Sequence, residues 1–241
     1  MNYLIIISLF VVAIVIHELG HFLTAIALGV KVKEFSLFIG PVIFTKKIKG
    51  IRYSLRAIPL AAYVAFKGES LENAPLYKKV PIILGGVLAN LLAAYLCWVI
   101  AITFQTQDLL TGIIGGFAVI GFFFQQMFSS FNVSDVSTPI GAVQEGGKIL
   151  GEQKMTMNNS NINLLPLAMF SGINISLFVT NLLPLSVLDG GQLVFAFLNP
   201  VFGRFKSYMT MKNYFDWFSL ALLLSIFIFA LKNDIFRLFA N

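Results

Sequence analysis

The stretch VIHELGHFL, residues Val15–Leu23, places both histidines of the chain in one apolar segment, with a glutamate between them. On a helix, His17 and His21 lie one turn apart on the same face, because residues four positions apart are surface neighbours. Two imidazoles at that spacing can both bind one Zn²⁺, at about 2.0–2.1 Å. Glu18 would face the open coordination position and accept a proton from water there. The motif therefore predicts a helical metal centre with its own general base.

The composition around this motif is that of an integral membrane protein. Of the 241 residues, 58% are apolar and 12% are charged, and the mean hydropathy is +0.85. An average soluble domain is about 45–50% apolar and about 25% charged. The net charge of +6 comes from basic residues that flank apolar segments, which indicates membrane topology and not nucleic-acid binding. Ionisable residues are costly inside a bilayer, so the motif is typical of a functional site and not of core packing.

Four segments are long and apolar enough to cross a bilayer, which takes roughly 20 residues. They span residues 3–28, 80–104, 164–185 and 215–231. We therefore expect a polytopic α-helical membrane protein of about four transmembrane helices, built as a single domain over residues 1–241 without a PDZ or CBS domain.

The basic residues predict how these segments are oriented. Ten Lys or Arg lie between the first and second segments, and only two lie between the second and third. The positive-inside rule places the first and third connections in the cytoplasm and both termini outside. That topology needs an even number of crossings between residues 105 and 163. We therefore expect the glycine-interrupted apolar stretch 109–131 not to cross the membrane.

Residues 31–66, in the first connection, alternate apolar and polar positions over short runs, with Gly40-Pro41 and Lys49-Gly50 as turn signals. This pattern predicts a small antiparallel β-sheet. The sheet is unusually apolar, and a sheet at the membrane must have its edges paired or covered by protein. We expect it to lie against the helices near the cytoplasmic face.

A catalytic zinc site needs a third protein ligand, and the chain has no third histidine. The single cysteine, Cys97, lies in an otherwise featureless apolar run, which leaves Asp189 and Asp216 as carboxylates beside membrane segments. Asp189 follows the third segment at the cytoplasmic depth of His17 and His21, and we predict it as the third ligand. Asp189 also precedes two glycines, so it is compatible with a turn or with the N-cap of a helix that begins near Gln192.

Two amides in apolar segments are unusual polar positions and candidates for a role in the reaction. Asn90 follows Gly86 at a spacing of four, which favours close helix packing, and Asn181 lies near the end of the third segment. Either amide has two interpretations. It is a satisfied packing residue, or it donates to the substrate backbone or the developing oxyanion.

These motifs, taken together, resemble the site-2 proteases, a family of intramembrane zinc metalloproteases. "FSLFIGPVIF", "IPLAAYVAFKGE" and "STPIGAVQ" (Ser137–Gln144) are similar to segments of its bacterial sigma-E-regulating branch, although only about sixty residues separate the second and third spans, where that branch carries PDZ domains. The resemblance implies that His17, His21 and Asp189 bind zinc, that Glu18 is catalytic, and that Asn90, Asn181, Gly86 and Pro184 contribute to substrate binding.

The expected function is that of a zinc-dependent intramembrane endopeptidase with one Zn²⁺ per chain. The resemblance implies substrates that are single-span membrane proteins or remnant signal peptides, in a multi-pass protein of the cell membrane whose active site faces the cytoplasmic side. A regulatory membrane partner is compatible with this, and nucleic acid is not an expected partner. The alternative is a zinc-binding membrane protein without protease activity, either a scaffold or a metal transporter.

Overall fold

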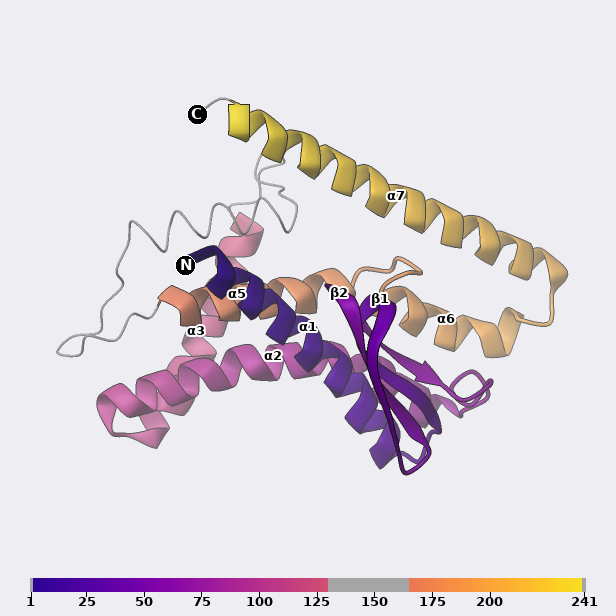
Figure 1. The fold of residues 1–241 in the computed structure, drawn as a ribbon, viewed down its shortest axis with the longest axis horizontal. Coiled ribbons are helices and arrows are strands. Elements are labelled where there is room, and N and C mark those ends of the chain that lie inside the picture. Colours follow the sequence, from indigo (N-terminus) through magenta and orange to yellow (C-terminus); the bar gives the residue numbers. More distant parts are fainter. Residues whose placement is uncertain (1, 130–164, 240–241) are drawn as a thin grey trace. The chain divides into compact units, whose positions relative to one another are not determined.

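The computed structural model describes residues 2–129 and 165–239. The chain divides into two compact units, one made of residues 1–10, 92–175 and 217–241, and the other made of residues 11–91 and 176–216. Figure 1 shows the elements, which in chain order are α1 (Asn2–Ala27), β1 (Val32–Ile48), β2 (Ile51–Phe66), α2 (Leu76–Thr106), α3 (Leu109–Ser129), α5 (Leu165–Asn181), α6 (Asp189–Phe202) and α7 (Lys206–Phe239).

In the second unit, β1 and β2 form the antiparallel sheet that the alternating pattern predicted. Lys49 and Gly50 make the tight turn between them, with φ angles of 49° and 83°. Gly40-Pro41, the other predicted turn, lies inside the span of β1. Residues 34–37 and 44–47 nevertheless pair with the same residues of β2 in opposite directions, so the chain does reverse at this point, as predicted. Phe38 and Gly40 have φ angles of 71° and 85°, and the register shifts around them.

As a result of these shifts, residues 34–37 of β1 have neighbours from β2 on both sides. Glu34 lies opposite both Ala65 and Arg52, and Ser36 lies opposite both Tyr63 and Ser54. This places Glu34 and Ser36 in the middle of the sheet, where both side chains are buried. Residues 62–66 pair only with β1 among the described residues, so their other edge is open.

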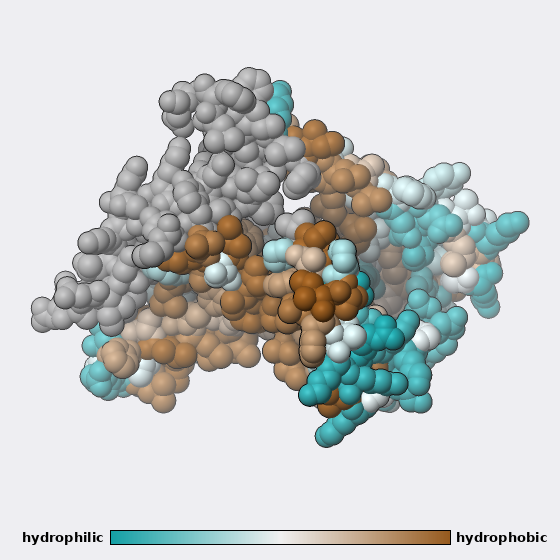
Figure 2. Space-filling model, in the orientation of Figure 1, coloured by the Kyte–Doolittle hydropathy of each residue, from teal (hydrophilic) through white to brown (hydrophobic). Residues whose placement is uncertain are grey.

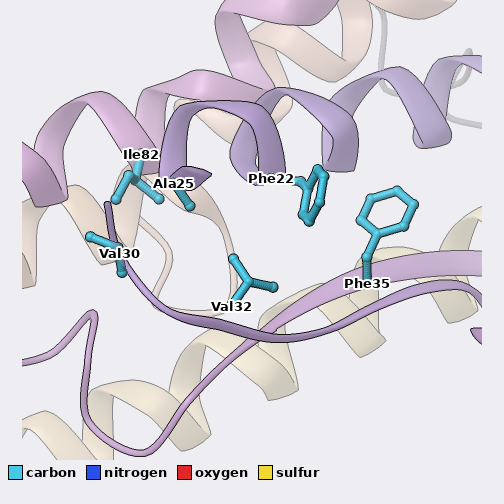
Figure 3. Close-up of a cluster of buried hydrophobic side chains, with 6 residues drawn as sticks. All are labelled: Phe22, Ala25, Val30, Val32, Phe35 and Ile82. Atoms are coloured by element: carbon cyan, nitrogen blue, oxygen red, sulfur yellow. The ribbon is translucent and has the colours of Figure 1, made fainter. Parts of the chain in front are cut away.

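The apolar face of the sheet packs on α1 and α2 through a small hydrophobic core. Figure 3 shows Phe22 and Ala25 of α1 together with Ile82 of α2 and residues of the first strand. The rings of Phe22 and Phe35 lie 5.0 Å apart, and Ile82 is 1% exposed. This core fixes the sheet against the turn of α1 that carries the histidines. The cluster is Phe22, Ala25, Val30, Val32, Phe35 and Ile82.

Helices α1 and α2 cross at glycines in the second unit. A Cβ atom on Gly85 would lie 2.7 Å from the carbonyl oxygen of Gly20, and a Cβ atom on Gly20 would collide with the carbonyl of Gly85. Real Cβ atoms essentially never come this close, so both positions require glycine. Gly20 belongs to the HELGH motif itself, which ties the close approach of the helices to the metal-binding turn.

In the first unit, α3 is a continuous helix, and its glycines do not interrupt it. We interpreted these residues as breaks in the sequence, but three of them form the face that packs on α2. A Cβ atom on Gly116 would lie 2.9 Å from Val99, and one on Gly115 would lie 2.7 Å from Ile102. The small residues therefore permit close helix packing. Whether 109–131 crosses the membrane stays a prediction.

The helices agree only in part with the four predicted membrane segments. Within the part of the chain that the structure describes, two helices, Leu4–Ala27 and Leu76–Thr106, are long and apolar enough to cross a membrane, and Leu109–Gln125 is a shorter apolar helix. The third predicted segment corresponds to α5, which has 17 residues, and the fourth lies inside the 34-residue α7. The number of crossings stays a prediction. Figure 2 shows hydrophobic side chains over the helices, whereas hydrophilic ones gather at one end of the sheet.

Candidate metal centre

The histidines of the HELGH motif lie in the C-terminal half of α1 and converge on the first residue of α6. Nε2 of His17 lies 3.1 Å from Nε2 of His21 and 3.1 Å from Oδ2 of Asp189, and Nε2 of His21 lies 3.2 Å from the same oxygen. The two imidazole rings are nearly perpendicular, at 84°. Three ligand atoms thus form an almost equilateral triangle.

This triangle has the size that a tetrahedral zinc site requires. With zinc–ligand distances of 2.0–2.1 Å, neighbouring ligand atoms of a tetrahedron lie about 3.3–3.4 Å apart. The observed separations are within about 0.3 Å of that value. Oδ2 of Asp189 is buried and makes no hydrogen bond to the described residues, so its lone pairs are available to a cation. His17, His21 and Asp189 form a group that could hold one metal ion, as predicted from the sequence.

The carbonyl oxygen of Ile82 orients the second histidine, since it lies 2.7 Å from Nδ1 of His21. A carbonyl only accepts hydrogen bonds, so Nδ1 of His21 carries the proton and Nε2 offers its lone pair to the metal. Ligand histidines in metalloproteins almost always have such a partner on the other ring nitrogen. Gly86, one turn further along α2, lies against the same ring: a Cβ atom there would lie 2.7 Å from Cδ2 of His21.

Asp189 is presented by a tight chain reversal between α5 and α6. Asp189 is not the N-cap of the following helix, a role that the sequence also allowed. Leu188 is the N-cap, and α6 begins at Asp189, three residues before the predicted start. A Cβ atom on Gly190 or Gly191 would collide with carbonyl groups of residues 182, 183 and 185. The two glycines therefore let the reversal fold tightly enough to bring the carboxylate to the histidines.

A pocket of about 260 Å³ opens beside the three ligands. Glu18 and Asn181 line it, and the backbone of Val64 on β2 hydrogen-bonds to Glu18. A water molecule takes up about 30 Å³ in the liquid, so the pocket has room for the water that hydrolysis consumes. The remaining residues of the wall are His17, His21, Tyr63, Phe66, Leu71, Ile82, Ile83, Val187, Asp189 and Gln192.

A family model described as peptidase family M50 matches residues 5–226. The chain belongs to peptidase family M50. This confirms the resemblance drawn from the HELGH motif and the residues around Asp189.

Curated M50-like relatives match part of the chain. A predicted zinc metalloprotease of Fusobacterium nucleatum is 33% identical over 130 residues, which are 48% of this chain and 38% of that protein. One from Campylobacter jejuni is 39% identical over 98 residues, or 35% of this chain and 26% of that protein. The chloroplastic membrane metalloprotease ARASP of Arabidopsis thaliana is 33% identical over 94 residues, or 34% and 21%. The matched stretches thus cover less than half the length of these relatives.

Of the residues predicted to bind the substrate, Asn181 lines the metal pocket, whereas Pro184 and Asn90 are not among the described residues of its wall. Asn181 lines the pocket and donates from Nδ2 to the carbonyl of Leu177. Pro184 is an exposed residue of the reversal before Asp189. Asn90 is fully buried, and its Nδ2 lies 3.4 Å from Nδ1 of His17. The substrate-binding roles of these residues stay predictions, and Ser137–Gln144 lies outside the described residues.

The two competing ligands considered from the sequence are not part of the group. Cys97 is a half-buried thiol of the first unit, and the carboxylate of Asp216 pairs with Lys212 at 3.0 Å. Sequence reasoning missed the carbonyl of Ile82 and the wall residue Tyr63. The alternating pattern of β2 could have indicated Tyr63, whereas a backbone carbonyl leaves no signal in the sequence.

Proposed function

We propose that this M50 chain is a zinc-dependent intramembrane endopeptidase that hydrolyses peptide bonds within or next to transmembrane segments. The observation that carries the proposal is the triangle of His17, His21 and Asp189 in an apolar helix, with Glu18 on the wall of the same pocket. Two histidines, a carboxylate and a glutamate outside the ligand set are the donors and the base that a hydrolytic zinc site requires.

Each residue of the site has a role in this reaction. When bound, Zn²⁺ supplies Lewis acidity, which polarises the peptide carbonyl and lowers the pKa of water. Glu18 accepts the proton of the attacking water and then delivers it to the leaving amine, so that its carboxylate is regenerated. Asn181 lines the pocket wall, and Nδ2 donates one hydrogen bond to the carbonyl of Leu177; in this proposal its second N–H donates to the backbone of the substrate.

The open edge of β2 supports a way for the substrate to reach the site. Residues 62–66 leave one edge unpaired among the described residues, and Tyr63, Val64 and Phe66 from this edge line the pocket. Peptide bonds of a helix are already hydrogen-bonded, so a transmembrane substrate must unwind before hydrolysis. An unwound segment would regain backbone hydrogen bonds by pairing with this edge.

The substrates we propose are single-span membrane proteins or remnant signal peptides, presented by the lipid bilayer. Membrane-protein relatives and two long apolar helices support a membrane location, and the excess of basic residues between the first two spans supports an active site toward the cytoplasmic side. A membrane partner that regulates access to the pocket belongs to the same proposal.

The test combines metal content with cleavage, using detergent-purified protein reconstituted with a model single-span substrate. We expect near one zinc per chain in the wild type and in Glu18→Gln, but little in His17→Ala and Asp189→Ala. Cleavage should fall by about 10²–10⁴-fold in Glu18→Gln, as for the loss of a general base. If Glu18→Gln cleaved as fast as the wild type, Glu18 would not be the base. A wild type that bound zinc but cleaved no substrate would support the scaffold, and zinc uptake into vesicles would support a transporter.

Strand pairing at the open edge has its own test. Val64→Pro removes the N–H that hydrogen-bonds to Glu18, whereas Val64→Ala keeps that donor. We expect Val64→Pro to lower the turnover of a membrane substrate with zinc content unchanged, and Val64→Ala to turn over nearly as fast as the wild type. Equal turnover by the proline variant would exclude pairing at this position.

A further inference from the structure

Asn90 is a fully buried amide on α2, and its side chain contacts a metal ligand. Its Nδ2 lies 3.4 Å from Nδ1 of His17, at the long end of the hydrogen-bond range. Its Oδ1 is also buried and has no hydrogen-bond partner among the described residues. A buried amide oxygen without a partner costs about 1–3 kcal/mol, so this half-satisfied side chain calls for an explanation.

The protonation state that zinc binding requires of His17 provides an explanation for this contact. A neutral imidazole that binds a metal through Nε2 carries its proton on Nδ1, which is then a hydrogen-bond donor. The amide nitrogen of Asn90 is a donor too, and two donors do not bond. A half-turn of the amide about its last bond exchanges nitrogen and oxygen, and the choice between these positions is an assignment made from the hydrogen-bond network.

After this half-turn, Oδ1 of Asn90 faces Nδ1 of His17 and accepts a hydrogen bond from its N–H. The amide nitrogen takes the buried position that the oxygen leaves. The arrangement then matches that of His21, whose Nδ1 donates to the carbonyl of Ile82. Both partners come from α2, one turn on either side of Gly86, which lies against the two histidines.

We propose that Asn90 is a positioning residue, whose amide oxygen holds the ring of His17 in the tautomer and orientation that bind zinc. Asn90 is not among the described residues that line the metal pocket, which favours this role over contact with the substrate. The inference rests on the metal centre proposed above and adds an outer ligand shell supplied by α2.

Zinc affinity, measured by competition with a chelator on the full chain in detergent, tests the role directly. Asn90→Leu keeps the approximate shape of the side chain but cannot accept a hydrogen bond, and we expect zinc to bind about 10–100-fold more weakly, the usual effect of losing such a partner. Asn90→Asp can only accept, and we expect it to bind zinc at least as tightly as the wild type. The matched control is Asn174→Leu, another fully buried amide, whose Nδ2 donates to the carbonyl of Phe170; its zinc affinity should not change.

The outcomes separate this inference from the proposed function. If the wild type did not bind zinc, the proposed metal centre itself would be wrong. A wild type that binds zinc, with Asn90→Leu binding it equally well, would overturn the role of Asn90 alone. If Asn90→Leu kept its zinc but lost kcat/KM, Asn90 would act on the substrate, as the sequence suggested. If Asn90→Leu did not fold, Asn90→Asp would still decide, because a large loss of zinc affinity there contradicts an accepting role.

Discussion

Gly86 of α2 lies directly against the ring of His21 and the backbone of His17. A Cβ atom at this position would lie 2.7 Å from Cδ2 of His21 and 2.8 Å from the carbonyl oxygen of His17. Both separations are shorter than real Cβ contacts, so only glycine fits. This close approach brings the carbonyl of Ile82 within 2.7 Å of Nδ1 of His21. Helix packing and metal-ligand orientation therefore depend on the same glycine.

The substitution Gly86→Ala should therefore weaken zinc binding by about tenfold or more, because the methyl group displaces the ring of His21 from its partner. Alanine favours helix formation over glycine by about 1 kcal/mol, so reduced helix propensity would not explain such a loss. Gly121→Ala is the matched control, since a Cβ atom there meets nothing within 4 Å. Zinc affinity by chelator competition is the measurement, and an unchanged affinity in Gly86→Ala would contradict the argument.

The third ligand is tested by comparing Asp189, the first residue of α6, with Asp216 of α7. Asp189→Asn replaces the buried carboxylate that faces both histidines with a neutral amide, and zinc should be lost on dialysis against a chelator. Asp216→Asn breaks only the ion pair with Lys212, and its zinc content should remain near one per chain. Elemental analysis of both variants makes the comparison. If Asp189→Asn kept its zinc and Asp216→Asn lost it, the third ligand would be Asp216 and not Asp189.

The ligand set was predictable from the sequence because it rests on short-range spacing. His17 and His21 are one helical turn apart, and Asp189 is one of few carboxylates next to an apolar segment. What surrounds these ligands was not predictable in the same way. The partner of His21 is a backbone carbonyl 61 residues away, and a carbonyl has no residue identity to detect. Asn90 was noticed as an unusual polar residue, but its contact with His17 depends on how two helices cross.

The sheet shows a similar division between local pattern and tertiary contact. Alternation predicted the strands between residues 31 and 66, and both were found. The turn signal at Gly40-Pro41 marked the change of direction, but the pattern did not predict that residues 34–37 would gain neighbours on both sides. Register of this kind depends on tertiary packing. The register decides which polar side chains of the sheet become buried, and Glu34 is the charged side chain that it buries.

Glu34 is 5% exposed and is the centre of a polar network behind the metal pocket. Its Oε1 accepts from Nη2 of Arg56 at 3.1 Å and from the hydroxyl of Tyr63 at 3.3 Å. Arg56 also donates from Nε to Ser36 at 3.0 Å and lies over the ring of Tyr63. Since Tyr63 lines the pocket, this network holds part of the pocket wall in place.

This network should make the stability of the sheet depend on pH. Burial alone would raise the pKa of Glu34, but hydrogen bonds from Ser54, Arg56 and Tyr63, with the charge of Arg56, hold it below its ordinary value of 4.5. A carboxylate whose pKa is depressed in the folded state contributes stability above its ordinary pKa, and that stability is lost as the pH falls through the folded value. The wild type should therefore lose stability as the pH is lowered below 4.5.

Glu34→Gln isolates this contribution. The neutral amide leaves Arg56 without its buried charge partner, so at pH 7 the variant should be less stable by about 1–3 kcal/mol. The difference from the wild type should shrink as the pH falls below 4.5, where Glu34 of the unfolded chain becomes protonated while Glu34 of the folded protein stays charged. Glu72→Gln, at an exposed position, is the control and should unfold like the wild type. Thermal unfolding in detergent at pH 7 and at pH 4 makes the comparison, and a difference that stayed constant between these pH values would show that the charge of Glu34 contributes nothing.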